Sequence, residues 1–191
     1  MGLPVRGPHP DAKGYPVNCR PLSIAGAYQV DIEALGDERG LFARTYCAAE
    51  FVALGIELPI AQCSISYNRD RYTLRGMHWQ RPPHPETKLV RCTAGQVWDC
   101  LLDLRPDSPT FKQWTAVELS AENRRAVLIP PECAHGFITL TPNTELFYMM
   151  STPYAPESAM GVRWNDPAFN IEWPANPEVL SAKDQSWPDF T

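Results

Sequence analysis

The 191-residue sequence contains no apolar run long enough to cross a membrane. A transmembrane helix needs about 20 consecutive apolar residues, and the N-terminal stretch MGLPVRGPHPDAKGYP lacks even the shorter apolar core of a secretory signal. Arg6 stands where a myristoylation signal has Ser or Thr. We therefore expect no membrane insertion, and one domain over residues 21–191 preceded by a loose N-terminal arm over residues 1–20.

Positive charge is also scarce. The chain has 17 Lys and Arg against 22 Asp and Glu, a net charge of −5, which argues against a general nucleic-acid surface. An anionic ligand would need a local cluster of cations. The stretch NRDRYTLRG supplies Arg69, Arg71 and Arg75, of which the first two are best interpreted as solvated residues at a strand edge.

Paired cysteine motifs are missing. The six cysteines are scattered, without a C-x-x-C pair, and several lie within apolar runs. This spacing favours buried free thiols in a reducing cytoplasm over a disulfide framework.

Long helical periodicity is absent as well, and 20 dispersed prolines divide the chain into short pieces. This pattern predicts an all-β fold, a sandwich or barrel, with short helices over 48–54 and 120–125. The turn-rich segment after Ser151 is expected to wrap the body as an ordered tail, because its apolar residues need cover. The predicted strands are 28–33, 41–47, 60–68, 72–80, 87–93, 96–104, 111–119, 126–130, 135–140 and 145–150.

Among the groups that could do chemistry, there is no G-x-S-x-G elbow and no glycine loop for phosphate. His78, in LRGMHWQ, is the candidate general base, because a neutral imidazole titrates near working pH. A carboxylate that accepts a hydrogen bond from the other ring nitrogen of His78 would fix the tautomer of the imidazole. The residues alone offer Asp99 and Asp184 for this role and do not choose between them. Asp99 shares one strand face with apolar residues and needs a partner if that face is buried, whereas Asp184 in SAKD also fits a helix-capping role.

A metal site is the rival interpretation of His78. A jelly roll commonly binds a metal through two histidines one residue apart, a glutamate and a later histidine. Here Gln80 follows His78 instead of a histidine, so only His84, Glu86 and His135 could complete a ligand set.

Eight ordered motifs resemble those of the dTDP-4-dehydrorhamnose 3,5-epimerases: GDERG, LRGMHWQ, KLVRC, DLRPDSPTF, LSAENRR, IPPECAHGF, WND and LSAKD. The resemblance extends from about residue 28 to residue 184. It implies a cupin-type jelly roll (a double-stranded β-helix) that forms a homodimer and uses no metal or other cofactor. It also implies an isomerase that epimerises a nucleotide-linked 4-keto-6-deoxyhexose at C3, at C5 or at both, in rhamnose-type deoxysugar biosynthesis.

The resemblance assigns roles to individual residues. His78 matches the base and Asp184 its partner, while Tyr148 matches the proton donor on the opposite face of the sugar and Lys88 the lysine at the ketone oxygen. The positions that match substrate contacts are Arg39, Gln62, Ser64, Arg75, His135 and Lys183, with Arg39 and Arg75 expected on the pyrophosphate.

Five positions depart from the family pattern, namely Arg44, Ser64, Met149, Pro153 and Ala159. They raise the hypothesis of an altered substrate, such as another base, a different sugar or epimerisation at only one carbon. A non-catalytic sugar-nucleotide-binding protein and a metal-dependent cupin enzyme remain the alternative functions.

Overall fold

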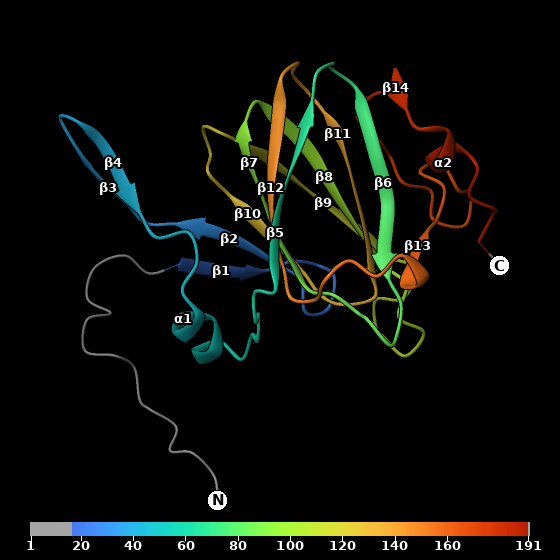
Figure 1. Ribbon diagram of the computed structural model, residues 1–191, viewed down its shortest axis with the longest axis horizontal. Helices are drawn as coiled ribbons and strands as arrows, with labels where there is room; N and C mark the ends of the chain where they lie inside the picture. Colours follow the sequence, from blue (N-terminus) through green and yellow to red (C-terminus); the bar gives the residue numbers. More distant parts are fainter. Residues whose placement is uncertain (1–16, 191) are drawn as a thin grey trace, which may run out of the picture.

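Two largely antiparallel sheets packed face to face form the body of the protein, as the computed structural model, which describes residues 17–190, shows (Figure 1). In spatial order, the first sheet consists of β1 (Val17–Pro21), β2 (Tyr28–Ile32), β10 (Ala126–Ile129), β7 (Lys88–Ala94), β12 (Thr144–Met150) and β5 (Gln62–Asn68). The second consists of β13 (Ala159–Gly161), β6 (Thr73–Gln80), β11 (Cys133–Thr139), β8 (Gln96–Asp103) and β9 (Trp114–Ser120), with β14 (Val179–Leu180) parallel to β6. This is the cupin-type jelly roll that the resemblance implied.

All ten predicted strands are confirmed to within a few residues. The predicted helix over 120–125 is wrong: the segment is a turn after β9, closed by hydrogen bonds that Ser120 and Asn123 exchange between side chains and backbone N–H groups. The arm boundary also differs, because residues 17–20 belong to β1 and pair with β2. The remainder of the expected arm lies outside the described residues.

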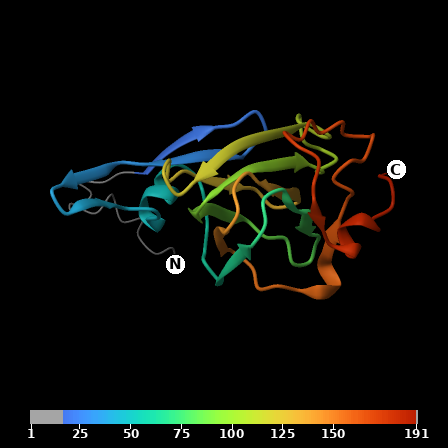
Figure 2. The same ribbon diagram turned by 90° about the horizontal axis from the view of Figure 1, so that it is seen from above.

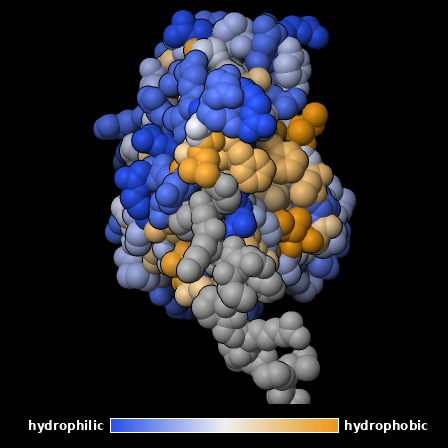
Figure 3. Space-filling model, turned by 90° about the vertical axis from the view of Figure 1, so that its left-hand side faces the viewer, coloured by the Kyte–Doolittle hydropathy of each residue, from blue (hydrophilic) through white to orange (hydrophobic). Residues whose placement is uncertain are grey.

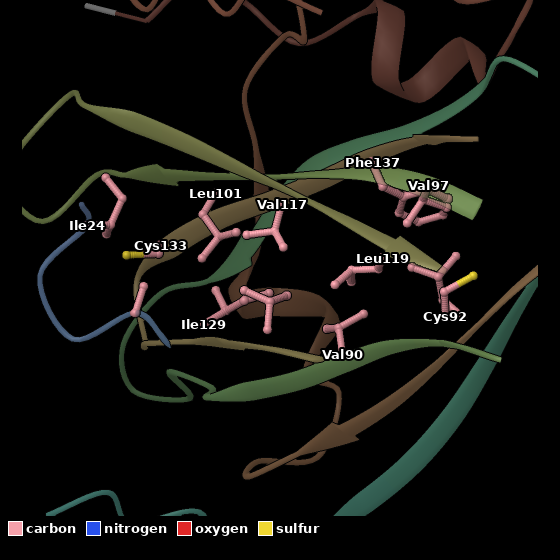
Figure 4. Packing of buried hydrophobic residues seen from close by; sticks show 13 residues of the cluster. Ile24, Val90, Cys92, Val97, Leu101, Val117, Leu119, Ile129, Cys133 and Phe137 are labelled. Carbon is pink, nitrogen blue, oxygen red and sulfur yellow. The ribbon is translucent and has the colours of Figure 1, made fainter. Parts of the chain in front are cut away.

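One hydrophobic cluster fills part of the space between the sheets (Figure 4). Alternation along β8 sends Val97 and Leu101 into this cluster and Cys100 and Leu102 to the other side of the sheet, as the period of two predicted. All six cysteines are free thiols, as the sequence predicted, but of the six only Cys92, Cys100 and Cys133 are buried.

Further layers cover the outer faces of both sheets. The helix α1 (Ala48–Ala53) buries Phe51 against the first sheet. The C-terminal tail, which includes the 3-10 turn η1 (Pro156–Ser158) and the helix α2 (Ala182–Gln185), packs Phe169 and Trp173 against the second sheet, so the predicted wrapping is confirmed. Between residues 17 and 190, no helix is both long and apolar enough to cross a membrane.

A β-hairpin made of β3 (Ala34–Asp37) and β4 (Gly40–Ala43) projects beyond the two sheets (Figure 2). Its strands pair with each other as a separate two-stranded sheet. It carries exposed apolar side chains: Leu35 is 50% exposed, Leu41 46% and Phe42 67%. The side of the molecule on which it projects shows apolar surface among polar surroundings (Figure 3). Such a hairpin is only marginally stable in isolation.

The backbones of β6 and β11 approach closely where glycines face each other. Gly76 has φ +127°, and a Cβ added there would lie 2.5 Å from the Cα of Gly136 and 2.8 Å from the carbonyl oxygen of His135. These contacts are with backbone atoms, which cannot rotate away. Glycine is therefore required two residues before His78, and the close approach helps to place that side chain.

We expect Gly76→Ala to lower the free energy of unfolding by about 2–4 kcal/mol, because it combines backbone strain with overpacking. The matched control is Gly40→Ala, since Gly40 has a similar φ of +131° but no atom within 4 Å of an added Cβ. Strain alone should cost that variant about 1 kcal/mol. Urea unfolding measures both, and equal losses would contradict the close-approach argument.

Candidate active site

A cavity of about 740 Å³ lies between the sheets and is partly closed by α2 and β14. Strands β5, β6, β7, β11 and β12 contribute to its wall, so residues from distant parts of the sequence meet there. Among the predicted site residues, the cavity wall contains His78, Asp184, Tyr148, Lys88, Gln62, Ser64, Arg75, His135 and Lys183. Arg39 is the exception.

His78 and Asp184 form the central hydrogen bond of the cavity. The Nε2 atom of His78 lies 2.6 Å from Oδ1 of Asp184, and the carboxylate is buried while the His78 side chain is 40% exposed. The structure thus pairs His78 with the side chain of Asp184 and not with that of Asp99. The other ring nitrogen of His78, Nδ1, forms no hydrogen bond with residues 17–190 and is available to a ligand.

The local structure of α2 explains how Asp184 reaches His78. Ser181 is the N-cap of the helix, and its hydroxyl accepts a hydrogen bond from the backbone N–H of Asp184 at 3.1 Å. The capping interaction and the pairing with His78 therefore coexist, because the first uses the backbone of Asp184 and the second its side chain. In Figure 1, α2 lies beside β6, which carries His78.

The pKa of Asp184 lies below the ordinary value for a carboxyl group. Burial by itself raises this pKa, but the hydrogen bond and charge of His78, the backbone N–H of Gly76 and the side chain of Ser181 together lower it by more. Asp184 is therefore ionised at neutral pH and stabilises a positive charge on His78.

Tyr148 enters the cavity from β12, in the sheet that faces β6. Burial raises its pKa well above the ordinary value for tyrosine, and the negative charge of Asp99 raises it further, although Arg75 acts in the opposite direction. Tyr148 is therefore a neutral phenol, which carries a proton that it can donate.

Asp99 and His135 form a second carboxylate–imidazole pair, with Oδ2 of Asp99 2.8 Å from Nε2 of His135. Asp99 is completely buried, so it has the partner that its position required. Burial raises the pKa of Asp99, and the charges of His135 and Lys88 only partly oppose this. The His135 ring also stands edge-on to Tyr148, with 6.0 Å between the ring centroids.

Lys88 and Glu86 form a buried ion pair in the cavity wall, with 2.9 Å between Nζ and Oε1. The sequence indicates Glu86 only as a candidate metal ligand. The signal that points to its true partner is the spacing of two residues, which places both side chains on one face of an extended chain.

The substrate-binding candidates fall into two groups. Arg75 bonds Asn68 through Nε at 2.7 Å, Gln62 accepts a hydrogen bond from the backbone of Tyr154 at 3.1 Å, and both line the cavity. Arg39 instead lies on the β3–β4 hairpin, where it pairs with Asp37 and is 84% exposed. The structure of one chain does not bring Arg39 to the cavity.

The four candidate metal ligands do not converge. His78 pairs with Asp184, Glu86 with Lys88 and His135 with Asp99, while His84 lies 3.1 Å from the Ser158 hydroxyl. Within the described part of the chain, no group of three His, Cys, Asp or Glu residues is placed to bind a metal ion.

The fold and this cavity define the class: a cupin-type enzyme whose cavity brings together an imidazole–carboxylate pair, a phenol and an ammonium group, the residue types that acid–base chemistry uses. Comparison with known proteins identifies the group within that class. The sequence profile of the dTDP-4-dehydrorhamnose 3,5-epimerases matches residues 21–191, and the chain belongs to this family.

Individual relatives agree with this assignment. A dTDP-4-dehydrorhamnose 3,5-epimerase from Salmonella typhimurium is 44% identical over 82% of this chain and 86% of its own. The crystal structure of the Bacillus anthracis enzyme with TDP and PPi bound has a TM-score of 0.88 at 37% identity, covering 91% of this chain and 99% of its own. A 3'-monoepimerase from Streptomyces bikiniensis, solved with dTDP-quinovose, has a TM-score of 0.82 at 33% identity, covering 88% of this chain and 85% of its own.

The lowered pKa of Asp184 predicts a pH-dependent contribution to stability. A carboxylate with a lowered folded pKa stabilises the protein fully above its unfolded pKa of about 3.9, and this contribution is lost as the pH falls through the folded value. The stability advantage of the wild type over Asp184→Asn should therefore be larger at pH 7 than at pH 3 in urea unfolding.

Asp189→Asn is the control for this measurement, because Asp189 is an exposed aspartate nearby that pairs with Arg163. If the wild type and Asp184→Asn differ in free energy of unfolding by the same amount at both pH values, the assigned role of the carboxylate is contradicted.

Proposed function

We propose that this protein epimerises a dTDP-linked 4-keto-6-deoxyhexose at one or both carbons beside the ketone, in rhamnose-type deoxysugar biosynthesis. The observation that carries the proposal is the His78–Asp184 pair on one sheet side of the cavity with Tyr148 on the facing sheet. Inversion of a carbon requires a base and an acid on opposite sides of the ring. Two facing sheets supply that arrangement.

In the first step, the free ring nitrogen of His78 takes the proton from the carbon beside the ketone. The C–H electron pair moves toward the carbonyl, so the ketone oxygen becomes an enolate. Asp184 stabilises the imidazolium that forms, and the Lys88 ammonium stabilises the enolate oxygen.

In the second step, Tyr148 donates its phenolic proton to the same carbon from the opposite face. The enolate electrons form the new C–H bond and the ketone is restored. Because the tyrosine pKa is raised, the tyrosinate recovers a proton readily, and His78 loses one, by exchange with water. A cycle therefore exchanges the carbon-bound hydrogen with solvent.

The cations of the cavity wall can bind an anionic substrate. Arg75 and Lys183 both line the wall, and a bidentate guanidinium suits phosphate oxygens. Binding a remote pyrophosphate holds the sugar in position for proton transfer.

The five departures from the family pattern give little support to a change of the nucleotide base in the substrate. Only Ser64 and Ala159 line the cavity. Arg44 pairs with Glu50, Met149 is buried with Phe51 in the cluster under α1, and the Pro153 carbonyl accepts a hydrogen bond from Gln80. A dTDP substrate, which the names of the relatives share, is therefore our proposal. The presence of a monoepimerase among the relatives keeps the number of inverted carbons open to measurement.

Incubation in deuterium oxide with dTDP-4-keto-6-deoxyglucose tests the reaction. We expect incorporation of deuterium at C3, at C5 or at both, and a loss of about 10²–10⁴ in rate for His78→Asn and for Tyr148→Phe. Mass spectrometry and proton NMR measure the incorporation. Binding without incorporation at either carbon would support a non-catalytic protein, and activity that depends on stoichiometric metal would support the metal-dependent alternative.

We further propose a homodimer in which the β3–β4 hairpin of one chain completes the cavity of the other. The hairpin exposes Leu35 and Leu41, and exposed apolar surface of this kind marks interaction sites. Arg39 lies on the same hairpin, away from the cavity of its own chain. A second copy is the simplest partner that would bring this arginine to a pyrophosphate, since two-fold dimers are the commonest oligomers.

Mixed dimers test the shared site. Arg39→Ala and His78→Asn should each be nearly inactive, whereas co-expression should restore about a quarter of wild-type activity, because half of the dimers are mixed and each has one intact site. Size-exclusion chromatography with light scattering reports the oligomeric state. Activity of the co-expressed sample no higher than that of the separate variants would contradict a shared site.

A further inference from the structure

Glu86 forms an ion pair with Lys88 but has no part in the reaction steps proposed above. Both side chains are nearly buried, 8% exposed for Glu86 and 11% for Lys88, and both line the catalytic cavity. A carboxylate beside the oxyanion-stabilising lysine reduces the net positive charge there. Its presence in a site that must hold negative charge calls for a reason.

The backbone that carries the pair is anchored from both sides. The N–H of Thr87 donates to the Ser151 hydroxyl at 2.8 Å, and the N–H of Ser151 donates to the carbonyl of Thr87 at 3.0 Å. Lys88 then begins β7 and pairs with β12 and β10. Glu86 and Lys88 therefore project from a fixed segment, and their contact does not depend on a mobile loop.

The hydrogen-bond donors of Lys88 are divided between Glu86, the backbone and the cavity. An ammonium group has three N–H donors. One points to Oε1 of Glu86 at 2.9 Å, and a second lies 3.5 Å from the carbonyl oxygen of His78, at the outer limit of a hydrogen bond. The third remains for a group in the cavity.

The lysine stem is flexible, with four rotatable carbons and a large rotamer entropy. Without the carboxylate, the ammonium would have only the long contact with His78 to orient it. With the carboxylate, two directions are defined, and the remaining N–H is aimed before the substrate arrives. A donor that is preorganised stabilises developing charge without reorganisation in the transition state.

We propose that Glu86 is a positioning residue that orients the Lys88 ammonium toward the ketone oxygen of the substrate. This inference rests on the proposed function and adds to it a residue that acts through Lys88. Glu86 itself does not touch the reacting atoms. Its charge also keeps Lys88 paired in the empty site, where an isolated buried ammonium would be costly.

Glu86→Gln tests the proposal, because it keeps the shape of the side chain and removes the charge. We expect kcat for deuterium incorporation to fall about 10-fold or more, as for other losses of positioning, with KM changed less than about threefold. Glu157→Gln is the matched control, since Glu157 is 69% exposed and does not line the cavity. That variant should match the wild type in both constants.

A double-mutant cycle with Lys88→Met separates positioning from a general structural role. If Glu86 acts through Lys88, Glu86→Gln should cause no further loss of kcat when Lys88 is already methionine. The four proteins are compared at a temperature at which circular dichroism shows each to be folded. Should Glu86→Gln fail to fold, Glu86→Asp replaces it in the cycle, with a smaller loss expected because the charge is retained.

The outcomes are distinct. An unchanged kcat in Glu86→Gln, or an equal loss in the presence and absence of Lys88, would overturn the positioning role while leaving the epimerase function intact. Absence of deuterium incorporation by the wild type would remove the proposed function and this inference together. A loss of kcat that disappears in the Lys88→Met background supports the proposal.

Discussion

The hydrogen bond between His78 and Asp184 is the interaction on which the site depends. It joins residues 106 positions apart in the sequence, one near the C-terminal end of β6 and the other on the short helix α2. The tail reaches that position because its apolar residues pack on the outer face of the second sheet. Tail packing therefore helps to build the candidate active site, since it brings an ionised carboxylate to an imidazole in the cavity wall.

Charge inside the cavity is arranged in pairs. Asp184 faces His78, Glu86 faces Lys88 and Asp99 faces His135, so each carboxylate has a cationic or imidazole partner. Pairing offsets the cost of removing these groups from water. It also fixes the direction of each donor. Tyr148 is a neutral phenol because burial and the charge of Asp99 raise its pKa. The other two cations of the wall, Arg75 and Lys183, form no ion pair with residues 17–190 and are available to an anionic ligand.

Much of the architecture could be predicted because a strand has a local signal in the sequence, the alternation of apolar and polar residues. Alternation in segments such as 96–104 and 145–150 reports which residues share a face, and the ten predicted strands are present. The strands that were not predicted, β1, β3, β13 and β14, are short, and two to five residues carry too little periodicity to recognise. The segment 120–125 failed as a helix because Ser120 and Asn123 bond to nearby backbone groups and close a turn instead.

The sequence by itself determined the all-β fold, the face on which each strand residue lies and the residue types available for acid–base chemistry. Only the tertiary structure decided which groups meet. The choice of Asp184 over Asp99 as the partner of His78 was open from the residues alone and was indicated by the resemblance, whereas the pairing of Glu86 with Lys88 and the distance of Arg39 from its own cavity were not foreseen. The reason is physical: strand periodicity is a property of neighbouring residues, but contacts between them across the fold depend on how separate sheets, tail and hairpin pack.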